Sequence, residues 1–216
     1  MPRRDIEFVT NEYYHVFNRG IDKRDIFMDK NDLYFFFKRL NDLNRVNHSD
    51  AYKHSRNRKD VEINEDKLVE IVAYCLLPNH FHLLLKQKND KGISKFMHRL
   101  GASYVNFFNK KYKRAGGLFQ SRFKAKHLSG EYALPIVASY VNLNYKHHHI
   151  NPKENLVKSS VFEYFGNELG DRICSADEIN GVIAEIGSLD DYQDFAKNAS
   201  QVFIDNKKSQ HLLLLD

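Results

Sequence analysis

Two histidines separated by one residue, His80 and His82, are the sharpest chemical feature of the sequence. They lie in an apolar segment that reads as a strand, where successive side chains alternate between faces. Both imidazoles would then share one face, while Phe81, Leu83 and Leu85 point into a core. Two imidazoles on a rigid element form half of a metal site. The alternative is a pair of histidines on a half-exposed strand with no ligand.

Tyr140 and Asn144 form a second candidate pair. They are four residues apart in a segment expected to be helical, so they would share one helix face. A tyrosine supplies a nucleophile, and an asparagine supplies an amide oxygen for a hard metal ion. The alternative is a core tyrosine with a surface asparagine, since the chain contains 12 tyrosines.

Three consecutive histidines, His147, His148 and His149, follow this pair. Consecutive residues of a helix point in different directions, so these rings would not converge on one ion. We expect a polar helix end there, and a structural role for His127.

Cations with interleaved aromatic rings form the third feature. Cations neutralise phosphates and rings stack on bases, as binding of single-stranded DNA requires. The alternative is a solvated charged surface. The residues expected to bind DNA are Arg19, Lys95, Arg99, Lys110, Lys111, Lys113, Arg114, Phe119, Arg122, Lys124 and Lys126.

Charge is distributed unevenly along the 216 residues. Residues 1–150 contain 27 Lys and Arg against 16 Asp and Glu, whereas residues 151–216 contain 6 against 12. This asymmetry favours a polyanion-binding part followed by an acidic part that does not touch the polyanion. No run approaches the roughly 20 apolar residues of a membrane span, and no secretory signal is recognisable. With Cys75 and Cys174 expected to be reduced thiols, the chain reads as cytoplasmic.

The elements that must position these residues follow from periodicity. Strands are expected at residues 12–18, 69–76, 81–85 and 119–128, and helices at 29–43 and 93–112. This order is that of the split βαβ, ferredoxin-like fold of the α+β class: an antiparallel sheet with helices on one face. A third helix, from Ser129 to about His149, would be an addition that carries Tyr140, and Pro135 would kink it or delay its start.

The chain would then divide into a nuclease domain at residues 1–150 and an acidic helical extension at 151–216. Short amphipathic helices are expected within the extension at residues 176–186 and 189–196. We expect the extension to pack against the core or against a partner subunit.

Four segments together resemble the REP-associated tyrosine transposases and, more widely, the HUH single-strand transposases of small bacterial insertion sequences. They are residues 14–20 (YHVFNRG), 73–82 (AYCLLPNHFH), 117–125 (GLFQSRFKA) and 139–144 (SYVNLN). The resemblance assigns His80, His82 and Asn144 to metal binding and Tyr140 to catalysis. It also implies Mg²⁺ or Mn²⁺, a homodimer, and hairpin-bearing single-stranded DNA as the substrate. Relatives commonly have Asn-Pro where this chain has Asn144-Tyr145.

The expected reaction is cleavage and rejoining of DNA through a 5′-phosphotyrosine. Because the phosphotyrosine keeps the bond energy, no nucleotide cofactor is needed, and no membrane partner is expected. A catalytically weak, hairpin-binding regulatory protein of the same fold is the first alternative. A metal phosphoesterase with water as nucleophile is the second.

Overall fold

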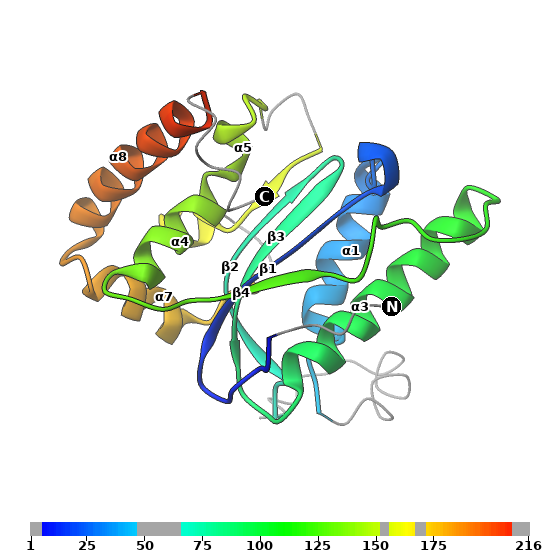
Figure 1. The fold of residues 1–216 in the computed structure, drawn as a ribbon, viewed down its shortest axis with the longest axis horizontal. Helices are drawn as coiled ribbons and strands as arrows, with labels where there is room; N and C mark the ends of the chain where they lie inside the picture. The colour runs from blue at the N-terminus through cyan, green and yellow to red at the C-terminus, as the bar shows by residue number, and fades with distance from the viewer. Residues whose placement is uncertain (1–5, 47–65, 152–155, 167–171, 209–216) are drawn as a thin grey trace.

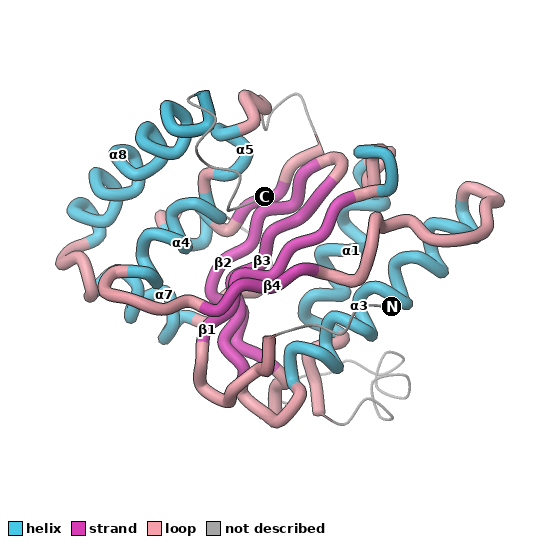
Figure 2. The backbone as a smooth tube through the Cα atoms, in the orientation of Figure 1, coloured by secondary structure: helices cyan, strands magenta, loops and turns pink. Residues whose placement is uncertain are grey.

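A five-stranded antiparallel sheet runs through the molecule in the order β4-β1-β3-β2-β5, with helices on both faces (Figures 1 and 2). The computed structural model describes residues 6–46, 66–151, 156–166 and 172–208. The strands are β1 (Tyr13–Arg19), β2 (Val69–Leu77), β3 (His80–Gln87), β4 (Lys124–His127) and β5 (Lys158–Ser159). The first four strands, with α1 (Lys30–Asp42) and α3 (Gly92–Lys111), form the ferredoxin-like arrangement that the sequence predicted.

Helices α1 and α3 cover one face of the sheet because each presents an apolar stripe at helical spacing. Asp29 caps α1 by accepting a hydrogen bond from the backbone N–H of Asp32. Phe36 and Leu40 of α1 are fully buried with Leu100 and Tyr104 of α3. The side chains of β3 that point toward α1 and α3 are packed in this core. The alternate side chains of the strand point to the other face of the sheet, where a functional site can form.

The other face carries α4 (Ala133–Asn142), α5 (Asn144–His147), α7 (Ala176–Ala184) and α8 (Leu189–Lys208) (Figure 1). The short helices η1 (Ile21–Lys23) and α6 (Val161–Tyr164) lie between the larger elements. Helices therefore cover both faces of the sheet, because the added helix and the extension occupy the face that α1 and α3 leave open.

The third helix has the delayed start that was one of the two expectations for Pro135, but it ends earlier than predicted. It begins at Ala133, after left-handed backbone at Gly130 and Tyr132, and Pro135 falls in the first turn, where its missing N–H removes no helical hydrogen bond. It ends at Asn142 rather than continuing to His149. The backbone carbonyl of Asn142 accepts a hydrogen bond from the Ser159 hydroxyl at 2.6 Å, and the N–H of Lys146 bonds to Leu143 instead. A partner outside the helix thus replaces the bond that would have continued α4.

The predicted fourth strand is also shorter than expected. Only Lys124–His127 forms β4, and Phe119 makes an isolated bridge to Gly20. In the extension, α8 continues well beyond the expected residues 189–196.

The extension is attached to the sheet through buried polar contacts. Glu163 accepts hydrogen bonds from the Tyr74 hydroxyl at 2.8 Å and from the backbone N–H groups of Ile173 and Cys174. Glu178 of α7 binds Tyr13 and Lys86, each at 2.7 Å. The extension therefore packs against the first 150 residues, while the domain boundary near residue 150 stays a prediction.

Cys75 and Cys174 are both free thiols, as expected, and Cys75 is fully buried in β2. None of the helices in the described parts of the chain is long and apolar enough to cross a membrane.

Candidate active site

The register between β1 and β3 places the two histidines of the H-x-H pair. His82 lies opposite Phe17 and His80 lies opposite Arg19, and residues that are directly opposite in an antiparallel pair share a face. Both histidines point to the α4 side and are buried, while Phe81 packs in the α1/α3 core. The alternation predicted from the sequence is therefore what positions the pair.

A cluster of imidazoles surrounds His82. The Nε2 atom of His15 lies 2.9 Å from Nδ1 of His82, and the ring centre of His80 lies 5.1 Å from that of His82. Burial, together with the neighbouring imidazoles of His15 and His80, lowers the pKa of His82 well below its ordinary value. The His82 ring is therefore neutral near pH 7, and one of its nitrogens keeps a lone pair.

Tyr140, near the end of α4, meets this cluster. Its ring centre lies 5.8 Å from those of both His15 and His82. On its other side it contacts His147 at 5.1 Å and Phe203 of α8 at 5.0 Å, and only 7% of its surface is exposed. The nucleophile expected from the sequence and one expected metal ligand thus lie together in a single chain, beneath a helix of the extension.

Asn144 is the first residue of α5, so the helix break separates it from Tyr140 and the two do not share one continuous helix. Its side chain is fully buried, and neither amide atom has a hydrogen-bond partner in the described structure. The Nε2 atom of His82 is buried without a partner as well. Buried polar atoms are normally hydrogen-bonded, so the amide oxygen of Asn144 and Nε2 of His82 fit the ligands of a metal ion.

Among the described residues, no group of three or more His, Cys, Asp and Glu side chains is arranged to hold a metal ion. The candidate ligand set has a different composition, two imidazoles and one amide oxygen.

The histidine run divides between two directions, as its helical spacing predicted. His147 faces the extension, where its Nε2 lies 3.0 Å from the Ser200 hydroxyl, and the ring of His148 lies 4.7 Å from that of His80. Sequence reasoning therefore missed two neighbours of the pair, His148 and His15. For His15 a signal was present, since it alternates with Phe17 and Arg19 on a strand of the same sheet.

Three of the predicted DNA-binding cations share the histidine face. Arg19 lies opposite His80, and on the edge strand Lys124 lies opposite Phe17 and Lys126 opposite His15. The ammonium of Lys124 is 5.8 Å from the ring centre of Phe17. These cations border the site on the β4 side.

The remaining predicted cations lie elsewhere, and several have structural partners. Lys111 binds Asp29 at 2.7 Å and Asp32 at 2.6 Å, where it fastens the start of α1. Arg114 bonds to Asn109, and Arg99 bonds to a backbone carbonyl of residue 45. Lys95 and Lys110, also on α3, and Lys113 and Arg122, in the segment that follows it, are exposed.

Phe119 packs edge-on against Phe81, with ring centres 5.8 Å apart. Its ring therefore faces the α1/α3 core, on the side of the sheet opposite to the histidine pair.

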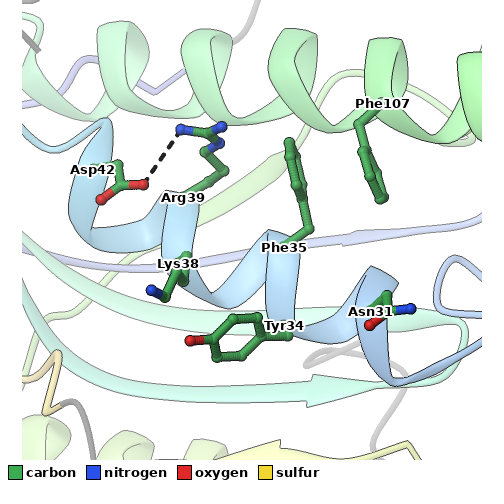
Figure 3. A pocket seen from close by; sticks show the side chains of 7 residues that line it. All are labelled: Asn31, Tyr34, Phe35, Lys38, Arg39, Asp42 and Phe107. Carbon is green, nitrogen blue, oxygen red and sulfur yellow. Dashed lines mark hydrogen bonds and ion pairs between the residues drawn. The ribbon is translucent and has the colours of Figure 1, made fainter. Parts of the chain in front are cut away.

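A pocket of about 290 Å³ lies on the α1/α3 side of the sheet, away from the histidines (Figure 3). Its floor includes the stacked rings of Phe35 and Phe107, whose centres are 3.9 Å apart. Tyr34 borders it and is 53% exposed. Arg39 at its rim pairs with Asp42 at 3.3 Å.

Residues 8–144 match the model of a family described as "Transposase IS200 like". Among solved structures, the chain is similar to a REP-associated tyrosine transposase bound to a REP hairpin. The TM-score is 0.51 at 14% sequence identity, covering 82% of this chain and 93% of the other. At that identity the likeness shows the fold alone. No curated protein sequence matches the chain. Because the family model spans more than half of the chain, including His80, His82, Tyr140 and Asn144, the chain belongs to the IS200-like transposase family.

Proposed function

We propose that this transposase cleaves and rejoins hairpin-bearing single-stranded DNA through a covalent 5′-phosphotyrosine on Tyr140. The observation that carries the proposal is the approach of Tyr140 to His82, with ring centres 5.8 Å apart. The nucleophile thus lies beside a buried, neutral imidazole whose Nε2 has no hydrogen-bond partner in the described structure, which supports a tyrosine next to a metal ligand.

His80, His82 and Asn144 would hold a divalent cation, Mg²⁺ or Mn²⁺. When bound, this ion would supply positive charge to the scissile phosphate. Two imidazoles favour Mn²⁺ over Mg²⁺, which prefers oxygen ligands. The inclusion of Mg²⁺ therefore rests on the family resemblance.

In the cleavage step, the phenolic oxygen of Tyr140 attacks phosphorus and loses its proton to water. The new bond joins Tyr140 to the 5′ phosphate, and the bond from phosphorus to the 3′ oxygen breaks. That oxygen takes up a proton and leaves as a 3′ hydroxyl. Attack by another 3′ hydroxyl reverses these changes and joins two strands, so no external energy source is needed.

Arg19, Lys124 and Lys126 would hold the phosphates of the single strand, because they share the face of the sheet that carries the histidines. The hairpin is proposed from the resemblance and from the hairpin bound in the similar structure. A homodimer is proposed from the resemblance alone. The contact between His82 and Tyr140 forms within one chain, so it supplies no separate argument for a second subunit.

The regulatory binder remains the second candidate, and one observation favours it. Tyr140 lies under Phe203 with 7% of its surface exposed. Access of DNA to the phenolic oxygen would therefore be restricted in the arrangement described here.

The test uses labelled single-stranded hairpin oligonucleotides from DNA flanking the gene, mixed with the full chain and Mn²⁺ or Mg²⁺. We expect a metal-dependent adduct that resists detergent and is lost after protease treatment. Tyr140→Phe should abolish it, whereas Tyr145→Phe, a change of another buried tyrosine in the same region, should retain it. Tight hairpin binding without an adduct would favour the regulatory binder. Cleavage that survives Tyr140→Phe would favour water as the nucleophile.

A further inference from the structure

We propose that Asn79 and His15 are positioning residues that set the tautomers of His80 and His82, so that both rings present an Nε2 lone pair to the cation. The inference rests on the proposed function for the identity of the site. A neutral imidazole carries one N–H, and the hydrogen bond made by one ring nitrogen decides the state of the other.

The tautomer of His80 follows from the amide of Asn79. The amide nitrogen of Asn79 donates to the backbone carbonyl of Lys23 at 3.1 Å, which turns its oxygen toward Nδ1 of His80, at 2.6 Å. An amide oxygen only accepts hydrogen bonds. Nδ1 of His80 must therefore carry the proton, and Nε2 keeps the lone pair.

The backbone around Asn79 holds this amide in place. The carbonyl of Asn79 accepts a hydrogen bond from the N–H of Gly20 at 2.9 Å. The preceding carbonyl, of Pro78, accepts from Ile26 and Phe27 at 2.7 and 3.0 Å. The turn between β2 and β3 is thus tied to the end of β1 and the segment after it, which explains how a turn residue can fix the orientation of an imidazole.

The tautomer of His82 is coupled to that of His15. One proton lies between Nε2 of His15 and Nδ1 of His82, which are 2.9 Å apart. If His15 donates it, the N–H of His82 is at Nε2, and if His82 donates it, the N–H of His15 is at Nδ1; both of these nitrogens are buried. Burial of the remaining N–H therefore does not distinguish the two directions, and a cation at Nε2 of His82 would select donation by His82. If His82 donates from Nδ1, its Nε2 lone pair is available to a cation, as in metal sites whose ligating histidines donate through their other nitrogen.

Both rings of this pair are held firmly. His15 and His82 are each 1% exposed, and their rings stack at 5.1 Å. Phe17 stacks on both, at 5.0 Å from His15 and 5.7 Å from His82. The pair therefore forms a rigid unit within β1 and β3, and His15 serves as the acceptor that orients His82.

The first measurement is the tautomeric state in the full chain, without a cation and with Mg²⁺, by long-range ¹H–¹⁵N correlation NMR at pH 7.5. We expect protonated Nδ1 and unprotonated Nε2 for His80 in both conditions and for His82 with Mg²⁺. A proton on Nε2 of His80 in either condition, or of His82 with Mg²⁺, would overturn the proposal for that ring. This measurement requires no substitution, so it does not depend on any variant folding.

The second measurement is Mn²⁺ affinity by calorimetry, with matched variants. His15→Leu and Asn79→Leu remove the acceptor and should weaken Mn²⁺ binding about 10- to 100-fold, as loss of such outer contacts does in other metal sites. His15→Gln and Asn79→Asp still supply a hydrogen-bond acceptor, an amide or a carboxylate oxygen, and should retain most of the affinity. Equal affinity in the leucine variants and the parent would refute the positioning role.

These results separate the inference from the proposed function. If the tautomers and affinities are as expected but Tyr140 forms no adduct with DNA, the positioning of the histidines stands and the cleavage proposal fails. If the adduct forms while Nε2 of His82 is protonated with Mg²⁺, cleavage stands and the positioning role of His15 is wrong.

Discussion

Lys124 and Lys126 reach the histidine face only because β4 pairs with β1 in a register that places them opposite Phe17 and His15. Their neighbours Ala125 and His127 point to the other face. Of the predicted cations, these two lysines and Arg19 are therefore the ones that the sheet itself aligns with the candidate site.

Replacing Lys124 and Lys126 together with alanine should weaken single-strand binding and reduce its dependence on salt. If each lysine contacts one phosphate, the slope of log affinity against log salt should become shallower by about 1.4. Fluorescence anisotropy of a labelled hairpin oligonucleotide at several salt concentrations measures this slope. The matched control is the double alanine variant of Lys110, in the last turn of α3, and Lys113, in the segment that follows, both of which are exposed. An equal loss in both variants would show that the DNA does not follow the β4 side.

At the residue scale, the pair His80 and His82 could be predicted because strand alternation is a local rule that one segment obeys alone. The ring centre of Tyr140 lies 5.8 Å from that of His82, and this tertiary contact was indicated by the family resemblance rather than by spacing. The alternation of His15 with Phe17 and Arg19 is visible in the sequence, but the contact of His15 with His82 depends on the register of two strands far apart in the chain, which the sequence pattern does not give.

At the scale of elements, the ferredoxin-like order was predictable from periodicity and a delayed start of the third helix from Pro135, while the C-terminal end of that helix was not. The helix stops at Asn142 because Ser159, from the extension, occupies its carbonyl. A side chain from elsewhere that hydrogen-bonds to one backbone carbonyl does not alter the local pattern of apolar residues, so this pattern cannot predict where the helix ends. The same break sets the start of α5 and hence the position of Asn144.

Helix α8 lies over Tyr140, which suggests that Phe203 limits access to the phenolic oxygen. Phe203→Ala should therefore speed adduct formation between about twofold and tenfold, since a contact between two aromatic rings is worth about 0.5–1.5 kcal/mol. The rate is measured at limiting hairpin DNA. Val202→Ala, a change of the exposed neighbour on the same helix, should leave it unchanged. Slower adduct formation in Phe203→Ala would instead mean that the ring holds Tyr140 in its reactive position.

At the scale of the whole molecule, the extension and the first 150 residues share one core. The uneven charge of the two parts suggested a separate acidic unit, but β5 pairs with β2 and α8 packs on α4. The amino-acid composition indicates which part of the chain is acidic. It does not indicate which buried contacts join the extension to the first 150 residues. Such contacts involve few residues, for example Glu163 with Tyr74.

Glu163→Leu should destabilise the full chain by about 3 kcal/mol, because the Tyr74 hydroxyl and two backbone N–H groups would lose a charged acceptor. Urea unfolding followed by circular dichroism measures the change. Glu163→Gln keeps an acceptor oxygen and should lose less stability. If Glu163→Leu unfolds at the same urea concentration as the parent, these contacts do not hold the extension to the sheet.

In the described structure, β4 and β5 form the two edges of the sheet. An exposed strand edge invites pairing with another chain, and lysines on such a strand are a common protection against aggregation. The strand β5 is only two residues long, whereas β4 is longer and carries Lys124 and Lys126 on alternate positions. The charges proposed to attract DNA would therefore also protect this edge from pairing with another chain, so the same two side chains would serve both purposes.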